Sequence, residues 1–280
     1  MTEADPAYAS FEQKWFAVHP EYAVASVFLA PSQRHRANAF GTLVHELEEA
    51  ALQPHEPQVT GIKLGWWRNE LGSAAAGRAN HPITKQLFAD ECARAIDSGS
   101  WLQLAETALA ASALPAAPDF PALLGQYRDF HAAVADIDAA LMPAAASEDD
   151  IGRNAALWTI SHLLRKLPAM ARGDESLPLP LDLLARHGLT RSGLAEATPE
   201  RAALLRDHLD LMARTMTDLT SAPSQRSLYQ RVRVRLDRKL IEAARKLPDP
   251  LSVIAGDTRA GRWSTLWTSW REAQDLARGD

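Results

Sequence analysis

Residues 161–189 read SHLLRKLPAMARGDESLPLPLDLLARHGL, and this stretch decides the fold. Its first part has apolar residues at helical spacing, although Pro168 is expected to kink that helix or to end it one turn early. A segment rich in Gly, Pro and charged residues follows, and a Leu-rich helical pattern then resumes. Gly188 stands just past the second helix, where a left-handed turn suits glycine. The stretch therefore predicts two helices joined by a loop.

The helical pattern extends along the rest of the chain. Apolar residues recur three and four apart, whereas segments rich in Val, Ile, Tyr and Thr are scarce. One stripe, which predicts a single long helix, consists of Leu123, Tyr127, Phe130, Val134, Ile137 and Leu141. The tripeptide Thr198-Pro199-Glu200 has the residue types of a helix start. Because no long linker or repeat interrupts the pattern, the sequence predicts an all-α protein with a single domain.

Composition limits the class of protein. The 280 residues are 46% hydrophobic, which is enough for a substantial core. Thirty Lys and Arg against 35 Asp and Glu leave a net charge of −5, which argues against nucleic acid as the main partner. The single Cys92 fits a reducing compartment, and neither a signal peptide nor an apolar run long enough for a membrane span is evident. We expect a cytoplasmic protein, with peripheral attachment to the inner face of the membrane left open.

Residues 36–50, RANAFGTLVHELEEA, predict an acidic helix led by Arg36. Carboxylates about one helical turn apart share a face and can hold Mg²⁺, which prefers oxygen ligands. Glu49, with Glu46 and Glu48 beside it, could still ligate such an ion, whereas a neutral His45 is a poor ligand for so hard a cation. The simpler interpretation is a solvated acidic face that holds no ion.

Residues 62–71, IKLGWWRNEL, precede a Gly-containing loop and the pair His81-Pro82. Adjacent side chains on a helix point about 100° apart, so one of Trp66 and Trp67 can enter the core while the other covers a neighbouring surface. Packing is therefore the main interpretation of this motif. Contact of the two tryptophans or of Arg68 with a ligand is the alternative.

Residues 226–246 are rich in Lys and Arg, and Trp267 and Trp270 follow nearer the C-terminus. An anionic partner, either an acidic membrane surface or a diphosphate, would suit such a basic helix. The simpler interpretation is a basic polar face whose long side chains cover apolar surface. A peripheral membrane or protein partner is thus an open hypothesis.

These motifs resemble the squalene/phytoene synthase family from about residue 22 to residue 273. The family's second metal-binding region has the form Leu-Arg-Asp-x-x-(Glu/Asp)-Asp, followed by a basic-Gly loop and Leu-Pro. The residues that match this frame are Leu164, Arg165, Arg172, Gly173, Leu177 and Pro178. The Trp-Trp-Arg helix and the His-Pro pair match as well. The resemblance implies an isoprenoid-synthase-like helical bundle around a central cavity, spanning residues 21–276 after an N-terminal extension of residues 1–20.

Family members join two prenyl diphosphates head to head, with Mg²⁺ held by paired aspartates. In this chain Lys166 and Met170 occupy the second pair of positions, and His162 stands where the family has Asn. An ammonium group a few ångströms from a Mg²⁺ position would repel the ion by about 4 kcal/mol at an effective dielectric constant of about 20. A divergent branch of the family, which resembles a complex I assembly factor, has also lost the acidic motifs.

The resemblance thus implies a synthase-like protein that lacks prenyl transfer, needs no cofactor, and binds an isoprenoid or other lipid or acts as an accessory factor. The candidate residues for binding a prenyl diphosphate are Arg36, Arg165 and Lys166. The alternative is an active Mg²⁺-dependent prenyltransferase of carotenoid or hopanoid synthesis, in which Asp174 joins Glu46 and Glu49 around fewer ions.

Overall fold

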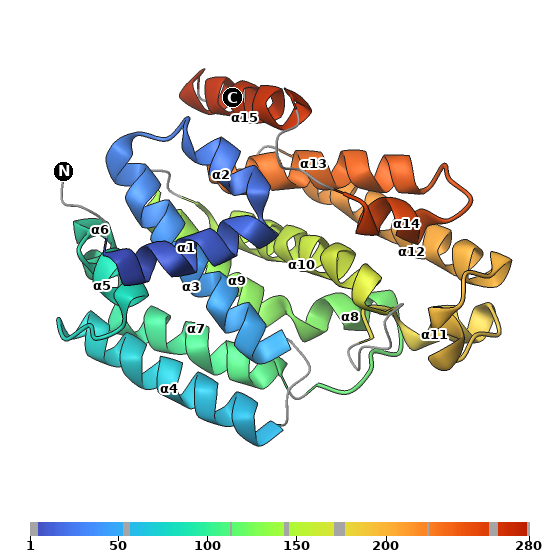
Figure 1. Ribbon diagram of the computed structural model, residues 1–280, viewed down its shortest axis with the longest axis horizontal. Helices are drawn as coiled ribbons and strands as arrows, with labels where there is room; N and C mark the ends of the chain where they lie inside the picture. Colours follow the sequence, from blue (N-terminus) through green and yellow to red (C-terminus); the bar gives the residue numbers. More distant parts are fainter. Residues whose placement is uncertain are drawn as a thin grey trace.

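The computed structural model describes residues 5–52, 57–112, 114–142, 146–170, 177–222, 224–257 and 263–278. Within these ranges the regular structure is helical and contains no strand (Figure 1). The all-α prediction is therefore confirmed. None of the described helices is both long and apolar enough to cross a membrane.

The helices have the following bounds: α1 (Pro6–Val18), α2 (Pro20–Ser26), α3 (Pro31–Leu52), α4 (Pro57–Ala75), α5 (Pro82–Phe88), α6 (Glu91–Ala95), α7 (Ser98–Ala111), α8 (Phe120–Gln126), α9 (Arg128–Leu141), α10 (Glu148–Met170), α11 (Leu181–Arg186), the 3₁₀ helix η1 (Ser192–Ala195), α12 (Pro199–Thr220), α13 (Leu228–Ala244), α14 (Pro250–Ala255) and α15 (Trp263–Arg278). Many of them begin in the same way. Asp5, His81, Thr198 and Asp249 each accept a hydrogen bond from a backbone amide, and each precedes a proline that opens the helix. The start predicted at Thr198 is confirmed.

Two local expectations need correction. The apolar stripe that begins at Leu123 is divided at Tyr127, where α8 ends and α9 begins. The early end expected at Pro168 is wrong, because α10 continues to Met170. A proline in the last turn removes only one backbone hydrogen bond, and the fully buried Leu167 fixes this turn in the core. The turn expected at Gly188 is confirmed by its φ of 63°.

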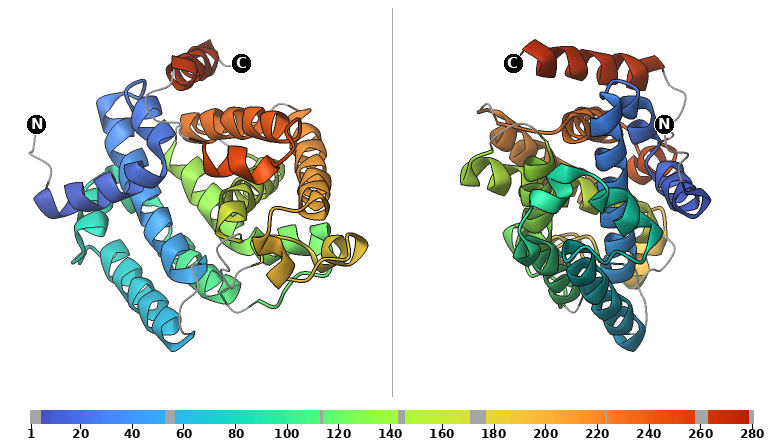
Figure 2. Two further views of the ribbon diagram at one scale, coloured as in Figure 1. Left: turned by 45° about the vertical axis from the view of Figure 1, so that its right-hand side comes forward. Right: turned by 90° about the vertical axis from the view of Figure 1, so that its left-hand side faces the viewer.

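Helices from the N-terminal and C-terminal parts of the chain form two neighbouring groups (Figure 2), and each group has its own apolar core. The N-terminal core is built around α3, α4, α7 and α9, with Leu43, Leu71 and Trp101 fully buried. The C-terminal core is built around α10, α12, α13 and α14, with Leu163 and Met212 fully buried. Helices α3, α9, α10 and α13 meet between the two cores, and this boundary contains the buried polar residues discussed below.

Helices α1 and α15 lie at the periphery in different ways. Helix α1 packs on α3 and α5 and inserts Trp15 into the interior. Helix α15 lies outside α2 and α13 (Figure 1). Its buried side chains are polar, namely Thr265, Thr268, Ser269 and Glu272. Its apolar stripe is exposed and consists of Trp263, Leu266, Trp267 and Trp270. This stripe is called the outer face of α15 below.

Candidate functional site

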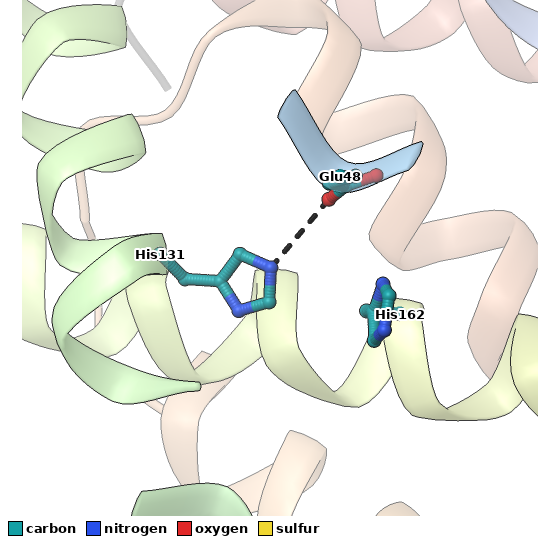
Figure 3. A group of neighbouring side chains, drawn as sticks. All are labelled: Glu48, His131 and His162. Atoms are coloured by element: carbon teal, nitrogen blue, oxygen red, sulfur yellow. Dashed lines mark ion pairs between the residues drawn. The ribbon is translucent and has the colours of Figure 1, made fainter. Parts of the chain in front are cut away.

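Three titratable side chains converge between the two cores. Glu48 on α3, His131 on α9 and His162 on α10 point toward one another (Figure 3). Their ligand atoms all lie within 4.8 Å of one another, and Glu48 Oε1 is 3.5 Å from His131 Nε2. Burial lowers the pKa of His131 and lowers that of His162 to about 3, so both imidazoles are neutral at pH 7. Burial opposes ionisation of Glu48, but the polar groups around it, chiefly His131, lower its pKa overall.

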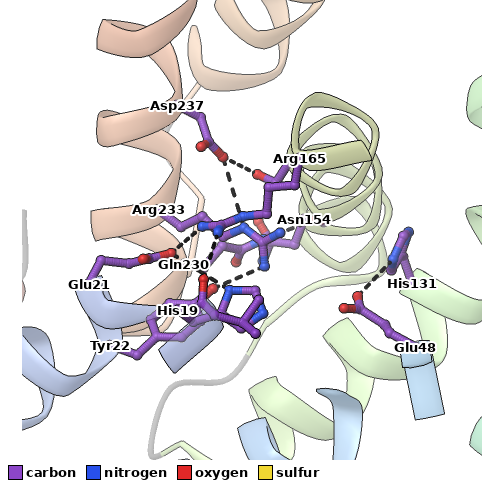
Figure 4. A network of polar contacts seen from close by, with 12 residues as sticks. His19, Glu21, Tyr22, Glu48, His131, Asn154, Arg165, Gln230, Arg233 and Asp237 are labelled. Carbon is purple, nitrogen blue, oxygen red and sulfur yellow. Dashed lines mark hydrogen bonds and ion pairs between the residues drawn. The ribbon is translucent and has the colours of Figure 1, made fainter. Parts of the chain in front are cut away.

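A second polar group lies on the inner face of α13 (Figure 4). The guanidinium of Arg233 is 3% exposed, donates a hydrogen bond of 3.1 Å to the Tyr22 hydroxyl and lies 3.9 Å from Asp237. It also stacks over the Trp158 ring, 4.8 Å from the ring centroid. Asp237 accepts a hydrogen bond from Ser161 on α10. The network therefore ties α2, α10 and α13 together.

Helix α2 contributes the carboxylate that neutralises Arg165. Glu21 is fully buried and forms an ion pair with the Arg165 guanidinium. Beside this pair, burial and the positive charge of Arg165 lower the pKa of His19 to about 4. His19 is thus neutral at pH 7 and stacks on Tyr22, with 5.5 Å between the ring centroids.

Aromatic side chains fill most of the space between α1, α2, α3 and α13. Trp15 stacks on Tyr22, and Tyr22 packs on Tyr229 with 4.9 Å between ring centroids. Gly41 on α3 permits this arrangement, because a Cβ at this position would overlap the Trp15 indole. The remaining central cavity has a volume of about 30 Å³ and is bordered by Glu48 and Arg233. It has room for water but for no larger molecule.

A larger space lies near the surface. This peripheral pocket has a volume of about 430 Å³ and lies between the start of α13, the end of α9 and α15. Its lining is mostly apolar and includes Phe28, Leu29, Ala135, Ala139, Met142, Leu228 and Leu276. Asp138 borders both the peripheral pocket and the central cavity. Arg226 is the cationic side chain among the described lining residues.

The candidate binding residues on α3, the predicted acidic helix, have different neighbours and do not converge on one site. Arg36 faces α6, where its Nη1 lies 3.2 Å from Cys92 Sγ and 3.6 Å from Asp90. Glu46 pairs with Lys14 of α1 at 2.8 Å. Glu49 is partly buried, and burial lowers the pKa of His45. The side chain that meets the histidines of α9 and α10 is Glu48.

The second candidate region offers cations rather than ligands. Lys166 lies one turn beyond His162 on α10, and its charge contributes to the lowered pKa of His162. Met170 ends α10, and its side chain and Asp174 lie outside the described residues. Mg²⁺ prefers oxygen ligands. With an imidazole at position 45, an ammonium at position 166 and Arg165 paired to Glu21, the described residues do not fit the magnesium clamp that the family implies.

The Trp-Trp-Arg motif serves packing in this structure. Trp67 is buried while Trp66 is 47% exposed, as the helical geometry predicted. Both rings contact the His81 ring. Glu70 accepts hydrogen bonds from the amides of Asn80 and His81, and so fixes the loop before α5. Arg68 forms a surface pair with Glu106 at 2.8 Å.

Sequence reasoning missed several central residues. His131 was hidden within the apolar stripe of α9, and nothing local links it to Glu48 or to His162. The inward face of α13 did carry a signal, because Gln230, Arg233 and Asp237 are spaced by three and four residues. An acid four residues after an arginine indicates a pair on one helix face. The basic composition of the helix concealed it.

The comparisons with known proteins agree with this architecture. The family model for squalene/phytoene synthase matches residues 17–243. A search of curated protein sequences finds no match. The structure is similar to a crystal structure of a dehydrosqualene synthase in complex with ligand, with a TM-score of 0.73, 11% identity, and coverage of 98% of this chain and 97% of that one.

It is also similar to the crystal structure of the squalene synthase HpnC from Alicyclobacillus acidocaldarius, with a TM-score of 0.57 and 15% identity over 88% of this chain and 95% of that chain. At such identities these likenesses show the fold alone, which is isoprenoid-synthase-like. The family model covers well over half of the sequence. The chain therefore belongs to the squalene/phytoene synthase family.

Proposed function

We propose that this protein keeps the family fold without prenyl transfer and binds a single isoprenoid or similar lipid chain as an accessory factor. The observation that carries the proposal is the closure of the central cavity. Sites for organic ligands usually enclose about 300–1,000 Å³, whereas about 30 Å³ remains here. Two prenyl chains would have to displace Trp15, Tyr22 and Tyr229 from the interior.

The pairing of the candidate arginines with carboxylates also supports the absence of prenyl transfer. A diphosphate needs unpaired cations or bound Mg²⁺ for its negative charges. Arg165, which was a candidate diphosphate ligand, is already neutralised by Glu21, and Arg36 pairs with Asp90. Binding a diphosphate at this place would cost the exchange of a buried ion pair.

The peripheral pocket supports the lipid-binding part of the proposal. Its volume of about 430 Å³ lies within the usual range for ligand sites, and its lining suits an apolar chain. Arg226 lies beside it, and burial and the neighbouring guanidinium groups of Arg231 and Arg153 lower the pKa of Arg226, while Asp150 and Glu272 oppose this shift. An anionic head group placed beside Arg226 would relieve this repulsion. The ligand class we propose is therefore an apolar chain with an anionic head.

A pair of matched variants tests the site. Ala139 lines the peripheral pocket, whereas its neighbour Ala140 is exposed and does not line it. We expect Ala139→Phe to weaken the binding of farnesyl phosphate at least tenfold, and Ala140→Phe to leave it unchanged, as measured by tryptophan fluorescence titration. Equal binding by the two variants, or no binding by the unmodified protein, would refute the proposed site.

A second candidate function is attachment to a membrane surface through the outer face of α15. Trp263, Trp267 and Trp270 are 85%, 60% and 42% exposed, and a water-exposed apolar stripe of this kind is costly for a protein without a partner. Tryptophan favours the membrane–water interface, where its ring is partly apolar and its N–H is solvated. The same helix forms a wall of the peripheral pocket through Leu276, which would place a bound chain next to the lipid surface.

Co-sedimentation with lipid vesicles tests this second function. We expect the unmodified protein to sediment with vesicles, and the double variant Trp267→Ala/Trp270→Ala to lose most of that binding. Trp66→Ala is the control, because Trp66 is also exposed but lies on α4. If the protein binds neither anionic nor zwitterionic vesicles, at low or at high salt, attachment to a membrane is refuted. A protein is then the partner that remains for the outer face of α15.

A further inference from the structure

The His131 ring is oriented by its neighbour Thr159 on α10. Its Nδ1 lies 2.8 Å from Thr159 Oγ1, and the Thr159 hydroxyl donates its proton to the Ala155 carbonyl at 3.0 Å. A metal ion at Nε2 requires the tautomer in which Nδ1–H donates to the Thr159 hydroxyl oxygen. In the neutral imidazole the other nitrogen, Nε2, then carries a lone pair and no proton.

Among the described residues, no hydrogen-bond donor contacts this lone pair. His131 is fully buried, and its Nε2 makes no hydrogen bond within the described residues. The atom that it faces is Glu48 Oε1 at 3.5 Å, which is too long for a normal hydrogen bond and is itself an acceptor. In that tautomer two acceptors face each other in the interior without a proton between them, and a cation between them removes the conflict.

We propose that Glu48, His131 and His162 form a binding site for a divalent transition-metal ion, distinct from the magnesium clamp of the family. Two imidazoles and one carboxylate suit Zn²⁺, Fe²⁺ or Co²⁺, whereas Mg²⁺ prefers oxygen ligands throughout. The hydrogen bond from Nδ1 to Thr159 is the outer contact that metal-binding histidines normally make, because it orients the ring and keeps Nε2 available.

The geometry requires only a small adjustment. Bonds from Zn²⁺ to nitrogen or oxygen are about 2.0–2.2 Å long, so the ligand atoms of a bound ion lie roughly 3–3.6 Å apart. In this structure the ligand atoms lie within 4.8 Å of one another. Side-chain rotations that bring the most distant atoms about 1 Å closer complete the site, and a fourth position stays open toward the central cavity, which Glu48 also borders.

The three ligands come from α3, α9 and α10, so a bound ion would link the N-terminal core to the C-terminal core. The ion would bind the folded protein and not the unfolded chain, and it should therefore raise the stability of the whole bundle. The lost magnesium positions and the proposed site are separate features, because the proposed ligands are Glu48, His131 and His162.

Metal titration of the untagged protein, after removal of metals with a chelator, tests the proposal. We expect one equivalent of Zn²⁺ to bind and to raise the unfolding temperature, while Mg²⁺ at the same concentration has no effect. Co²⁺ should bind to the same site and produce the visible absorption of nitrogen-coordinated cobalt. Glu48→Gln and His162→Gln should each weaken Zn²⁺ binding by about 100-fold or more.

Thr159→Val provides the most specific arm, since it removes the acceptor of Nδ1–H without touching a ligand. Loss of such an outer contact typically weakens metal binding by about 10–100-fold, and a purely structural role for Thr159 would leave the affinity unchanged. His208→Gln is the matched control, because His208 is equally buried but lies in the C-terminal core against Phe120. An unfolding temperature of the unmodified protein that is identical with and without Zn²⁺, or Zn²⁺ binding that survives Glu48→Gln and His162→Gln, overturns the proposal.

Discussion

The central cavity and the peripheral pocket differ in what fills them. The central cavity has a volume of about 30 Å³, is filled up to that volume by stacked aromatic rings, and is bordered by Glu48 and Arg233. The peripheral pocket keeps about 430 Å³, has a mostly apolar lining and lies beneath α15. The comparison teaches that a bundle with the synthase-like fold can have its ligand-sized pocket at the edge and not at the centre. Closure of the centre comes from side chains of α1, α2 and α13 and not from a change of fold.

The largest expected effect concerns the buried pair of Arg233 and Asp237 on α13. Replacing Arg233 with Met would remove the guanidinium that lies 3.9 Å from the buried Asp237, and breaking a buried pair in this way typically costs about 3–5 kcal/mol. Urea unfolding measures the change in the free energy of unfolding. Arg68→Met is the control, because the pair of Arg68 and Glu106 is half exposed and should contribute less than about 1 kcal/mol. Similar effects of the two substitutions would contradict a structural role for the network.

Opening the central cavity should have the next largest effect. Trp15→Ala removes a ring that is 2% exposed and packs against Gly41. Large-to-small substitutions of this kind cost about 3–5 kcal/mol, mainly through the cavity left behind. The same unfolding measurement with Trp66→Ala should show a much smaller loss. A cost for Trp15→Ala below that of Trp66→Ala would mean that Trp15 does not close the cavity.

Asp138 separates the two spaces and should make stability depend on pH. Burial raises the pKa of Asp138 from 3.8 to about 6. The folded state therefore holds its proton more tightly than the unfolded chain, so the contribution is fully present below about pH 4 and is lost as the pH rises through about 6. We expect Asp138→Asn to be more stable than the unmodified protein by about 3 kcal/mol at pH 7.5. Unfolding at several pH values measures this, and parallel pH curves for the two proteins would contradict it.

The sequence predicted the elements better than it predicted the site. The helix start at Thr198 follows from local rules, and so does the burial of Trp67 beside an exposed Trp66. Caps and the angles between successive side chains on a helix depend only on near neighbours. The site depends on contacts across the chain. His131 meets Glu48 from a different helix, and Glu21 meets Arg165 from 144 residues away. Such pairs leave no spacing signal in the sequence, so the resemblance pointed to Glu46 and Glu49 while the structure brings Glu48 to the histidines.

The most direct test of the central claim is incubation of the purified protein with farnesyl or geranylgeranyl diphosphate and Mg²⁺, with a working family synthase alongside. Condensed product and released diphosphate are both measured. The closed cavity, the pairing of Arg165 with Glu21 and the ammonium group of Lys166 predict neither product nor diphosphate above the level without protein. Formation of a head-to-head product would contradict the account and would show that the interior opens to hold two prenyl chains.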